Sequence, residues 1–264
     1  RDSSISPIDT SLVACACFDE GVKLWNIETI EEIISFKGHS LCVEFSHDGK
    51  LLAFDNYAAK IRIMNVESKE IVHSFEGHVR SISSISFSKD DSILASGSDD
   101  KTLRLWNVDT GEQICILKEY DDEVGNVVFN CNNVLACSYG ESIDFWNIDT
   151  KKCIKTLGEI HAYEIYNLGF SSDGSILASC SFDETVILSK TDSGEEEIVT
   201  LKGHTLDVNN VCFSSDDKFL VSCSRDNSTK IWDLDNHSCI KTFLGHTRPV
   251  RNAVFSKDTN HIVS

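Results

Sequence analysis

Two sets of residues in this chain carry the three side-chain types of a serine hydrolase. The sets are His78, Ser96 and Asp100, and His204, Ser222 and Asp226. In a hydrolase the histidine activates the serine hydroxyl as a nucleophile, and the aspartate orients the histidine. An enzyme needs that constellation once, whereas here it recurs with the same spacing. The repetition favours a structural role for these residues over catalysis.

A tryptophan extends each set. Trp106 and Trp232 each lie 28 residues after the histidine of their set. A buried indole has one N–H donor that needs an acceptor, and a serine hydroxyl on a neighbouring strand can accept it. The hydroxyl then bonds the histidine, and the histidine bonds the aspartate. We expect two such structural tetrads, with Ser98 and Ser224 as alternatives for the serine.

Both sets belong to a repeat of about 42 residues. A phenylalanine marks it at Phe45, Phe87, Phe129, Phe170, Phe213 and Phe255. The clearest copy spans 77–118. Short apolar runs with the alternation or β-branched content of strands occupy 82–87, 93–98, 102–107 and 113–117. Polar turn residues separate the runs, so each unit predicts a four-stranded antiparallel meander.

A Gly-His dipeptide, a Phe-Ser-x-Asp turn, a later Asp and a closing Trp-Asp or Trp-Asn recur along nearly the whole chain. This pattern resembles the WD40-repeat family. The resemblance implies an all-β fold, a β-propeller whose repeats each form one four-stranded antiparallel blade. We expect one domain over residues 1–264, with six recognisable blades and a truncated one, as part of a seven-bladed or longer array. The units span roughly 1–37, 38–76, 77–118, 119–158, 159–202, 203–244 and, in part, 245–264.

Three units depart from the pattern. In the second, His39 precedes Phe45 by six residues, against nine elsewhere, so either its first strand is short or residues are missing. The fourth has Tyr120 at the histidine position and Gly140 at the aspartate position. The fifth has Ser189 in place of tryptophan. We expect these units to be either looser than the others or specialised for binding.

The chain is acidic, with a formal net charge of −18 and a sequence pI of about 4.8. Phosphate contacts dominate nucleic-acid binding, so this charge argues against a nucleic-acid partner and also against an anionic membrane surface. No apolar run reaches the length of a membrane helix. We therefore expect neither a nucleic-acid partner nor a membrane association.

The eleven cysteines form no C-x-x-C pair, so we expect neither a metal nor a cofactor nor a disulfide framework. Five lie in apolar runs, and two occupy matching positions of two repeats, so these seven are interpreted as fillers of small apolar sites, namely Cys15, Cys137, Cys180, Cys212, Cys223, Cys153 and Cys239. Free cysteines suit a reducing compartment. We expect a cytoplasmic location, with a nuclear or cytoskeleton-associated one left open.

The resemblance to WD40 propellers implies that partners meet the loops around the Gly-His and the turn aspartate. The residues carried onto that surface are Tyr139, Tyr166, Phe182, Glu123, Glu164, Asp207, Asn209, Arg225, Arg251 and Phe18. Aromatic residues are frequent anchors of binding patches. The carboxylates among them favour a basic peptide or loop as the partner.

These observations predict a non-catalytic scaffold for protein–protein interaction, a subunit of a larger multiprotein complex. The alternative is a propeller enzyme with a site at the mouth of the channel. Such an enzyme needs one reactive cluster, placed once. Here the reactive-looking residues recur with the fold, and the chain has no Gly-rich phosphate loop or H-E-x-x-H motif.

Overall fold

The computed structural model describes residues 2–17, 19–56, 59–192, 197–256, 259 and 261–264. Over these residues the chain forms six four-stranded sheets and one two-stranded sheet, and strands adjacent in sequence pair with one another. Among the same residues, no helix is long and apolar enough to span a membrane. The chain divides into two compact units, Arg1–Val127 and Val128–Ser264, which are described one after the other.

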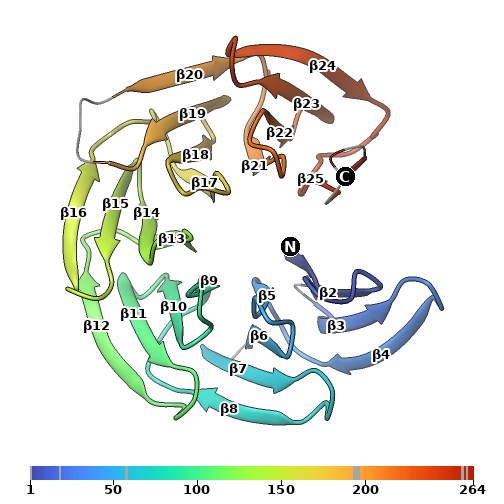
Figure 1. Cartoon of the computed structure of the whole chain (residues 1–264), viewed down its shortest axis with the longest axis vertical. Helices are drawn as coiled ribbons and strands as arrows, with labels where there is room; N and C mark the ends of the chain where they lie inside the picture. Colours follow the sequence, from blue (N-terminus) through green and yellow to red (C-terminus); the bar gives the residue numbers. More distant parts are fainter. Residues whose placement is uncertain (1, 18, 57–58, 193–196, 257–258, 260) are drawn as a thin grey trace. The chain divides into compact units, whose positions relative to one another are not determined.

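The first unit contains three four-stranded sheets (Figure 1). The first comprises β1 (Asp2–Ile5), β2 (Leu12–Cys17), β3 (Gly21–Asn26) and β4 (Glu31–Phe36). The second comprises β5 (Val43–Phe45), β6 (Leu51–Asn56), β7 (Lys60–Asn65) and β8 (Ile71–Phe75). The third comprises β9 (Ile82–Phe87), β10 (Ile93–Ser98), β11 (Thr102–Asn107) and β12 (Gln113–Glu119). Three of the four strands predicted in the clearest copy are confirmed with their bounds, and the fourth is two residues longer than predicted.

The second unit contains most of the fourth sheet and all of the later ones. The fourth comprises β13 (Val124–Phe129), β14 (Val134–Tyr139), β15 (Ser142–Asn147) and β16 (Lys152–Leu157). The fifth comprises β17 (Ile165–Phe170), β18 (Ile176–Ser181), β19 (Thr185–Lys190) and β20 (Ile198–Lys202). The sixth comprises β21 (Val208–Phe213), β22 (Phe219–Ser224), β23 (Ser228–Asp233) and β24 (Ser238–Leu244). The two-stranded sheet comprises β25 (Val254–Phe255) and β26 (Ile262–Val263).

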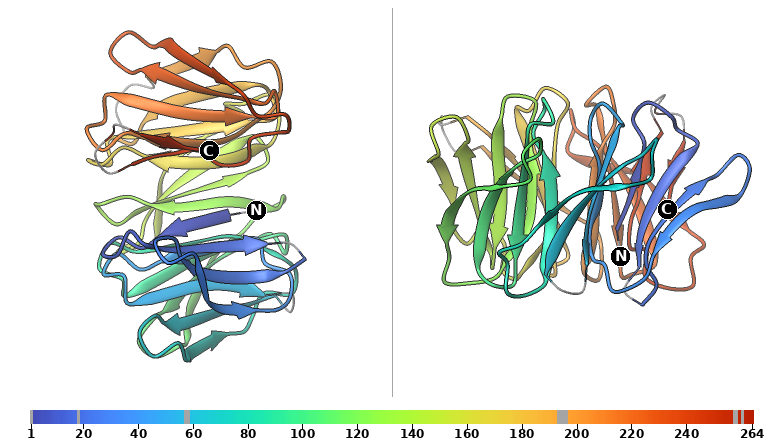
Figure 2. Two further views of the ribbon diagram at one scale, coloured as in Figure 1. Left: turned by 90° about the vertical axis from the view of Figure 1, so that its right-hand side faces the viewer. Right: turned by 90° about the horizontal axis from the view of Figure 1, so that it is seen from below.

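Within each unit the sheets succeed one another as propeller blades, and their turns gather at the two ends of the strands (Figure 2). The second strand β10 is almost wholly buried, whereas the outermost strand β24 is exposed along its whole length. The core lies between neighbouring sheets. Phe75 of β8, for example, stacks on Trp106 of β11 with ring centroids 5.2 Å apart.

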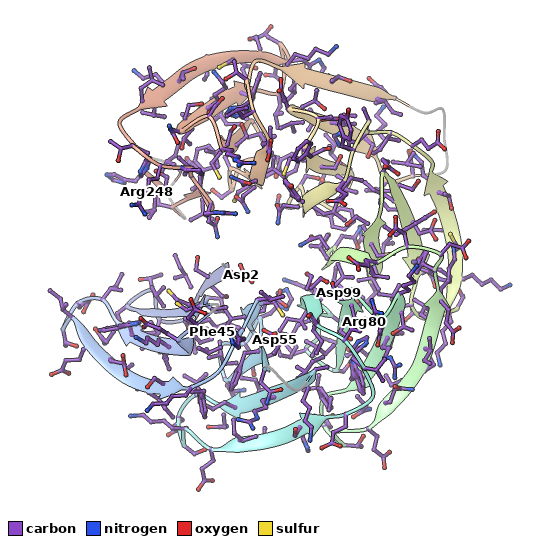
Figure 3. The ribbon with its side chains drawn as sticks, turned by 180° about the vertical axis from the view of Figure 1, so that it is seen from behind. Asp2, Phe45, Asp55, Arg80, Asp99 and Arg248 are labelled. Atoms are coloured by element: carbon purple, nitrogen blue, oxygen red, sulfur yellow. The ribbon has the colours of Figure 1, made fainter. Side chains whose placement is uncertain are left out.

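The second sheet has a shortened first strand, because β5 has only three residues. The missing pairing is replaced by a carboxylate. Asp55 accepts hydrogen bonds from the Ser40 hydroxyl at 2.7 Å and from the backbone N–H groups of Leu41 and Cys42 at 2.7 and 3.0 Å. Figure 3 labels Asp55 with Phe45 of the shortened strand. The short spacing in the sequence therefore reflects a real variation of this blade.

Side chains on first strands join consecutive blades. A side-chain oxygen of one first strand accepts a backbone N–H of the next first strand. The pairs are Asp2 and Val43, Ser4 and Phe45, Glu44 and Phe87, and Asn167 and Val211. Asn210 likewise accepts the N–H of Ala253, just before β25. The serine and asparagine acceptors are neutral, whereas Asp2 and Glu44 are ionisable.

Two aspartates join blades at the turns between first and second strands. Asp91 has a left-handed φ of 60° and accepts the backbone N–H groups of His47 and Asp48 at 2.8 and 2.9 Å. Asp217, with φ of 54°, accepts the Ser172 N–H at 2.8 Å. A short polar side chain tolerates the left-handed region and reaches neighbouring backbone, so one residue type serves both needs.

Candidate partner-binding site

The predicted tetrads form, and the serine in each is the first of the two alternatives. Ser96 accepts the Trp106 indole N–H at 2.8 Å and lies 2.7 Å from His78 Nε2, and His78 Nδ1 lies 2.8 Å from Asp100. The equivalent bonds in the sixth sheet are 2.8, 2.7 and 2.8 Å. Ser98 instead donates to the Ser81 carbonyl.

These bonds exclude the serines of the tetrads from acting as nucleophiles on a substrate. Ser96 and Ser222 are fully buried, and an indole N–H occupies each hydroxyl oxygen. Burial lowers the pKa of His78, so the ring is neutral and relays one chain of hydrogen bonds. Burial alone would raise the pKa of Asp100, but hydrogen bonds from Thr102 and His78 lower it to about 2.

The fifth sheet keeps the half of the tetrad that holds the loops. His161 Nδ1 lies 2.8 Å from Asp183, and His161 Nε2 lies 2.8 Å from Ser179. The same Asp183 accepts the backbone N–H of Ala162 at 3.0 Å. Ser189, at the tryptophan position, is buried. The loop before β17 is therefore fixed without an indole.

The fourth sheet uses a different network, which the sequence did not indicate. Asp144 is fully buried and accepts the Thr156 hydroxyl at 2.6 Å and the Tyr139 hydroxyl at 3.3 Å. Burial and the Asp144 carboxylate raise the pKa of Tyr139 to about 12. Tyr139 was predicted as a binding residue, but its hydroxyl is engaged within its own sheet.

Three aromatic rings lie together on the loops of the fifth sheet. Tyr163, Tyr166 and Phe182 are 57%, 39% and 42% exposed. Phe182 contacts Tyr163 at 5.5 Å and Tyr166 at 6.3 Å between ring centroids, both edge to face. We call these three residues the aromatic cluster. Its backbone is held by bonds from Phe182 N–H to the Glu164 carbonyl and from the Ser181 hydroxyl to the Tyr163 carbonyl.

Charged side chains surround the cluster. Burial and the carboxylates of Asp207 and Glu164 raise the pKa of Tyr166, while Arg225 and Arg251 act in the opposite direction. Glu164 is exposed. The prediction that Asp207 is exposed is wrong, because it is only 7% exposed and its carboxylate lies 3.3 Å from Arg225.

The remaining predicted residues lie in different places. Asn209 is half-buried, and its side chain donates to the Val250 carbonyl at 2.7 Å, so it joins β21 to the segment before β25. Glu123 is exposed in the first unit. Phe18 lies outside the described residues. Of the predicted residues, the structure therefore brings Tyr166 close to Phe182, Glu164, Arg225 and Arg251.

Sequence reasoning missed Tyr163, Leu206 and Arg248, which are all exposed. They occupy one repeat position, two residues after the loop histidine, which the predicted surface did not include. Figure 3 shows Arg248 on the segment that follows the sixth sheet. Aligning that position across the repeats would have found all three.

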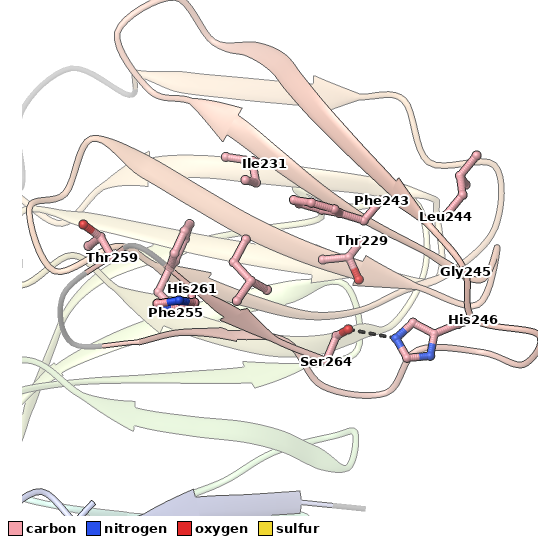
Figure 4. A pocket seen from close by; sticks show the side chains of 11 residues that line it. Thr229, Ile231, Phe243, Leu244, Gly245, His246, Phe255, Thr259, His261 and Ser264 are labelled. Carbon is pink, nitrogen blue, oxygen red and sulfur yellow. Dashed lines mark hydrogen bonds between the residues drawn. The ribbon is translucent and has the colours of Figure 1, made fainter.

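A cavity of about 540 Å³ lies between β24 and the two-stranded sheet (Figure 4). Phe243 lines it and is 44% exposed, whereas the equivalent Phe75 is 1% exposed beneath the indole of the next sheet. His246 Nε2 lies 2.8 Å from Ser264, as in the tetrads. The space equivalent to this cavity is filled, next to Phe75, by Trp106 of the third strand β11.

The cysteines are all free. The prediction that seven of them fill small apolar sites is wrong for two of the seven. Cys153 and Cys239 are exposed on the outer strands β16 and β24, while Cys137, Cys180 and Cys223 are buried as predicted. Over the described ranges, no group of three or more histidine, cysteine, aspartate or glutamate side chains is arranged to hold a metal ion.

Blades of four antiparallel strands, joined in sequence and fixed by tetrads, define a repeat protein of the β-propeller class. The family model "WD domain, G-beta repeat" matches residues 69–107, 151–188, 195–233 and 237–264, more than half of the chain. The chain belongs to the WD40-repeat family.

Several curated proteins are similar to parts of the chain. Apoptotic protease-activating factor 1 of Homo sapiens is 31% identical over 150 residues, 53% of this chain and 12% of the relative. Small ribosomal subunit protein RACK1 of Drosophila melanogaster is 26% identical over 156 residues, 55% of this chain and 49% of the relative. Protein FIZZY-RELATED 1 of Arabidopsis thaliana is 29% identical over 210 residues, which are 73% of this chain and 44% of the relative. The chain thus spans less than half the length of each.

Proposed function

We propose that this chain is a non-catalytic scaffold that docks a segment of a partner protein on the aromatic cluster. The observation that carries the proposal is three exposed rings in mutual contact on loops fixed by the His161–Asp183 pair. Aromatic side chains dominate the energy of many interfaces, and a surface that is already rigid loses little entropy on binding. An apolar side chain of the partner packs against these rings.

The exposed Glu164 carboxylate beside the cluster favours a lysine or arginine of the partner at that edge. The buried serines of the tetrads support a non-catalytic role against the alternative of a propeller enzyme. RACK1 is named as a protein of the small ribosomal subunit. By analogy, we place this chain in a larger protein assembly, and its free cysteines fit the cytoplasm.

The test is affinity purification from the source cells with three baits, namely the chain, its Tyr166→Ala/Phe182→Ala variant and its Phe243→Ala variant. Phe243 is an equally exposed aromatic residue on β24, so it controls for loss of a ring. We expect one partner to be lost only with the double variant, while urea unfolding of the double variant stays unchanged. A partner retained equally by all three baits would refute docking on the cluster.

A further inference from the structure

Equivalent loop positions of the repeats carry different chemistry. The position two residues after the loop histidine is occupied by Arg80, Tyr163, Leu206 and Arg248 in successive histidine-bearing units. The position five residues after the histidine is occupied by Ser83, Tyr166, Asn209 and Arg251. The position before the turn aspartate is occupied by Asp99, Phe182 and Arg225. In the second unit the fifth sheet thus contributes only aromatic residues. The sixth sheet contributes an exposed leucine and an arginine, and the segment before β25 contributes two arginines.

A backbone hydrogen bond joins the segment that carries two of the arginines to the turn that carries the third. The Val250 N–H donates to the Ser224 carbonyl at 3.1 Å, which places the segment between Arg248 and Arg251 against the turn that carries Arg225. Arg225 and Arg251 both act electrostatically on the hydroxyl of Tyr166. The cluster and these arginines therefore belong to one continuous loop surface.

The local charge opposes the charge of the chain. Three of its seven arginines lie here, although the net charge is −18. Asp207 neutralises part of this charge, but it is buried, whereas the Arg225 side chain remains 59% exposed. The guanidinium groups can therefore contact a ligand from the solvent side. A planar guanidinium pairs well with carboxylates, because its N–H groups match the two oxygens.

We infer that the partner segment carries an acidic stretch of aspartate or glutamate, which binds Arg225, Arg248 and Arg251 next to the side chain docked on the aromatic cluster. This inference rests on the proposed function and specifies the partner's chemistry. The exposed Glu164 also acts electrostatically on Tyr166, so the surface offers a carboxylate as well as guanidinium groups beside the aromatic rings. The basic partner expected from the sequence thus accounts for the carboxylate only.

The experiment selects peptides from a random 12-residue phage library on the immobilised chain. We expect selected peptides to combine an aromatic or aliphatic residue with neighbouring aspartate or glutamate. Synthetic copies with a fluorescent label are then titrated against Arg225→Gln/Arg251→Gln, and the double variant should bind about tenfold more weakly. Arg80→Gln is the control, because Arg80 is an exposed arginine on a loop of the third sheet, at the repeat position of Arg248.

The outcomes separate the inference from the proposed function. Peptides whose binding is lost in Tyr166→Ala/Phe182→Ala but unaffected in the arginine variant would overturn the acidic stretch and leave the docking site standing. Peptides that bind all variants equally would overturn both. Selected peptides that carry only lysine and arginine, or that bind only when a serine is phosphorylated, would also overturn the inference.

Discussion

Replacing Glu44 by glutamine should stabilise the chain at alkaline pH and leave its stability almost unchanged near pH 4.5. The Glu44 carboxyl oxygen accepts the Phe87 N–H at 2.9 Å across two blades. Burial, together with the nearby carboxylates of Asp2 and Asp91, raises the pKa of Glu44 to about 8, although hydrogen bonds from Phe87 and Ser86 act in the opposite direction. The folded chain therefore holds this proton through neutral pH.

The sign and size of the effect follow from proton linkage. An unfolded glutamate loses its proton above its ordinary pKa of 4.5, whereas folded Glu44 keeps it to about pH 8. Raising the pH between these values therefore favours unfolding, and below 4.5 the effect vanishes. At 1.36 kcal/mol per pH unit the limit is about 5 kcal/mol. Because Glu44 is only partly buried, solvent screening reduces the expected value to about 2 kcal/mol.

Glutamine keeps an oxygen that can accept the same N–H but has no charge, so Glu44→Gln isolates the ionisation. The assay is urea unfolding followed by tryptophan fluorescence at pH 4.5, 6, 7.5 and 9. The stability advantage of the variant should grow with pH and level off above 8. Glu67→Gln removes the same charge from an exposed turn and should show no such trend.

A constant free-energy difference between Glu44→Gln and the natural chain from pH 4.5 to pH 9 would refute this reasoning. It would mean that the Glu44 carboxyl titrates alike in the folded and unfolded chains. A variant less stable at every pH would show that the side chain contributes geometry and not charge.

Two further predictions concern the joints of the scaffold. Ser96→Ala removes the shared hydrogen-bond partner of a buried indole and a buried imidazole, so it should lower the free energy of unfolding by about 2–4 kcal/mol. The control Ser74→Ala changes an exposed serine and should leave the free energy of unfolding unchanged. Equal urea midpoints for the two variants would contradict a stabilising role of the tetrad. Asp91→Ala and Asp217→Ala each remove a carboxylate that accepts backbone N–H donors of the preceding blade, so each should lower the free energy of unfolding by about 1–2 kcal/mol. The control Asp109→Ala changes an exposed aspartate and should leave the free energy of unfolding unchanged. A decrease no larger than that of the control would show that these joints contribute nothing to stability.

The repeat made the blades predictable, because strand alternation and turn residues are local properties that recur in register. It could not choose between Ser96 and Ser98, which point to the same side of β10. The antiparallel ladder decides, since Leu94 pairs with Trp106 and Ser96 then lies within reach of the indole. Ser98 lies at the register shift of the β9–β10 pair and bonds the loop instead.

The binding surface was less predictable, because exposure depends on where side chains turn after the backbone is fixed. The repeat position made Asp207 a surface residue, but its carboxylate lies 3.3 Å from Arg225 and is buried. The role of Tyr139 stays a prediction, because its ring is half-buried and its hydroxyl bonds Asp144 within its own sheet. Neither pair of residue types recurs at that spacing in the other units.

The fifth sheet shows which half of a tetrad holds the loops of a blade. The fifth sheet lacks the tryptophan, yet it keeps the His161–Asp183 pair, and Asp183 holds the loop that carries Tyr163. The fourth sheet lacks both the histidine and the aspartate, and Tyr139 is bonded within the sheet. The indole stabilises the core between blades, whereas the histidine and aspartate fix the loops. The exposed rings of the aromatic cluster therefore lie on a sheet that keeps the histidine and aspartate, although it lacks the tryptophan.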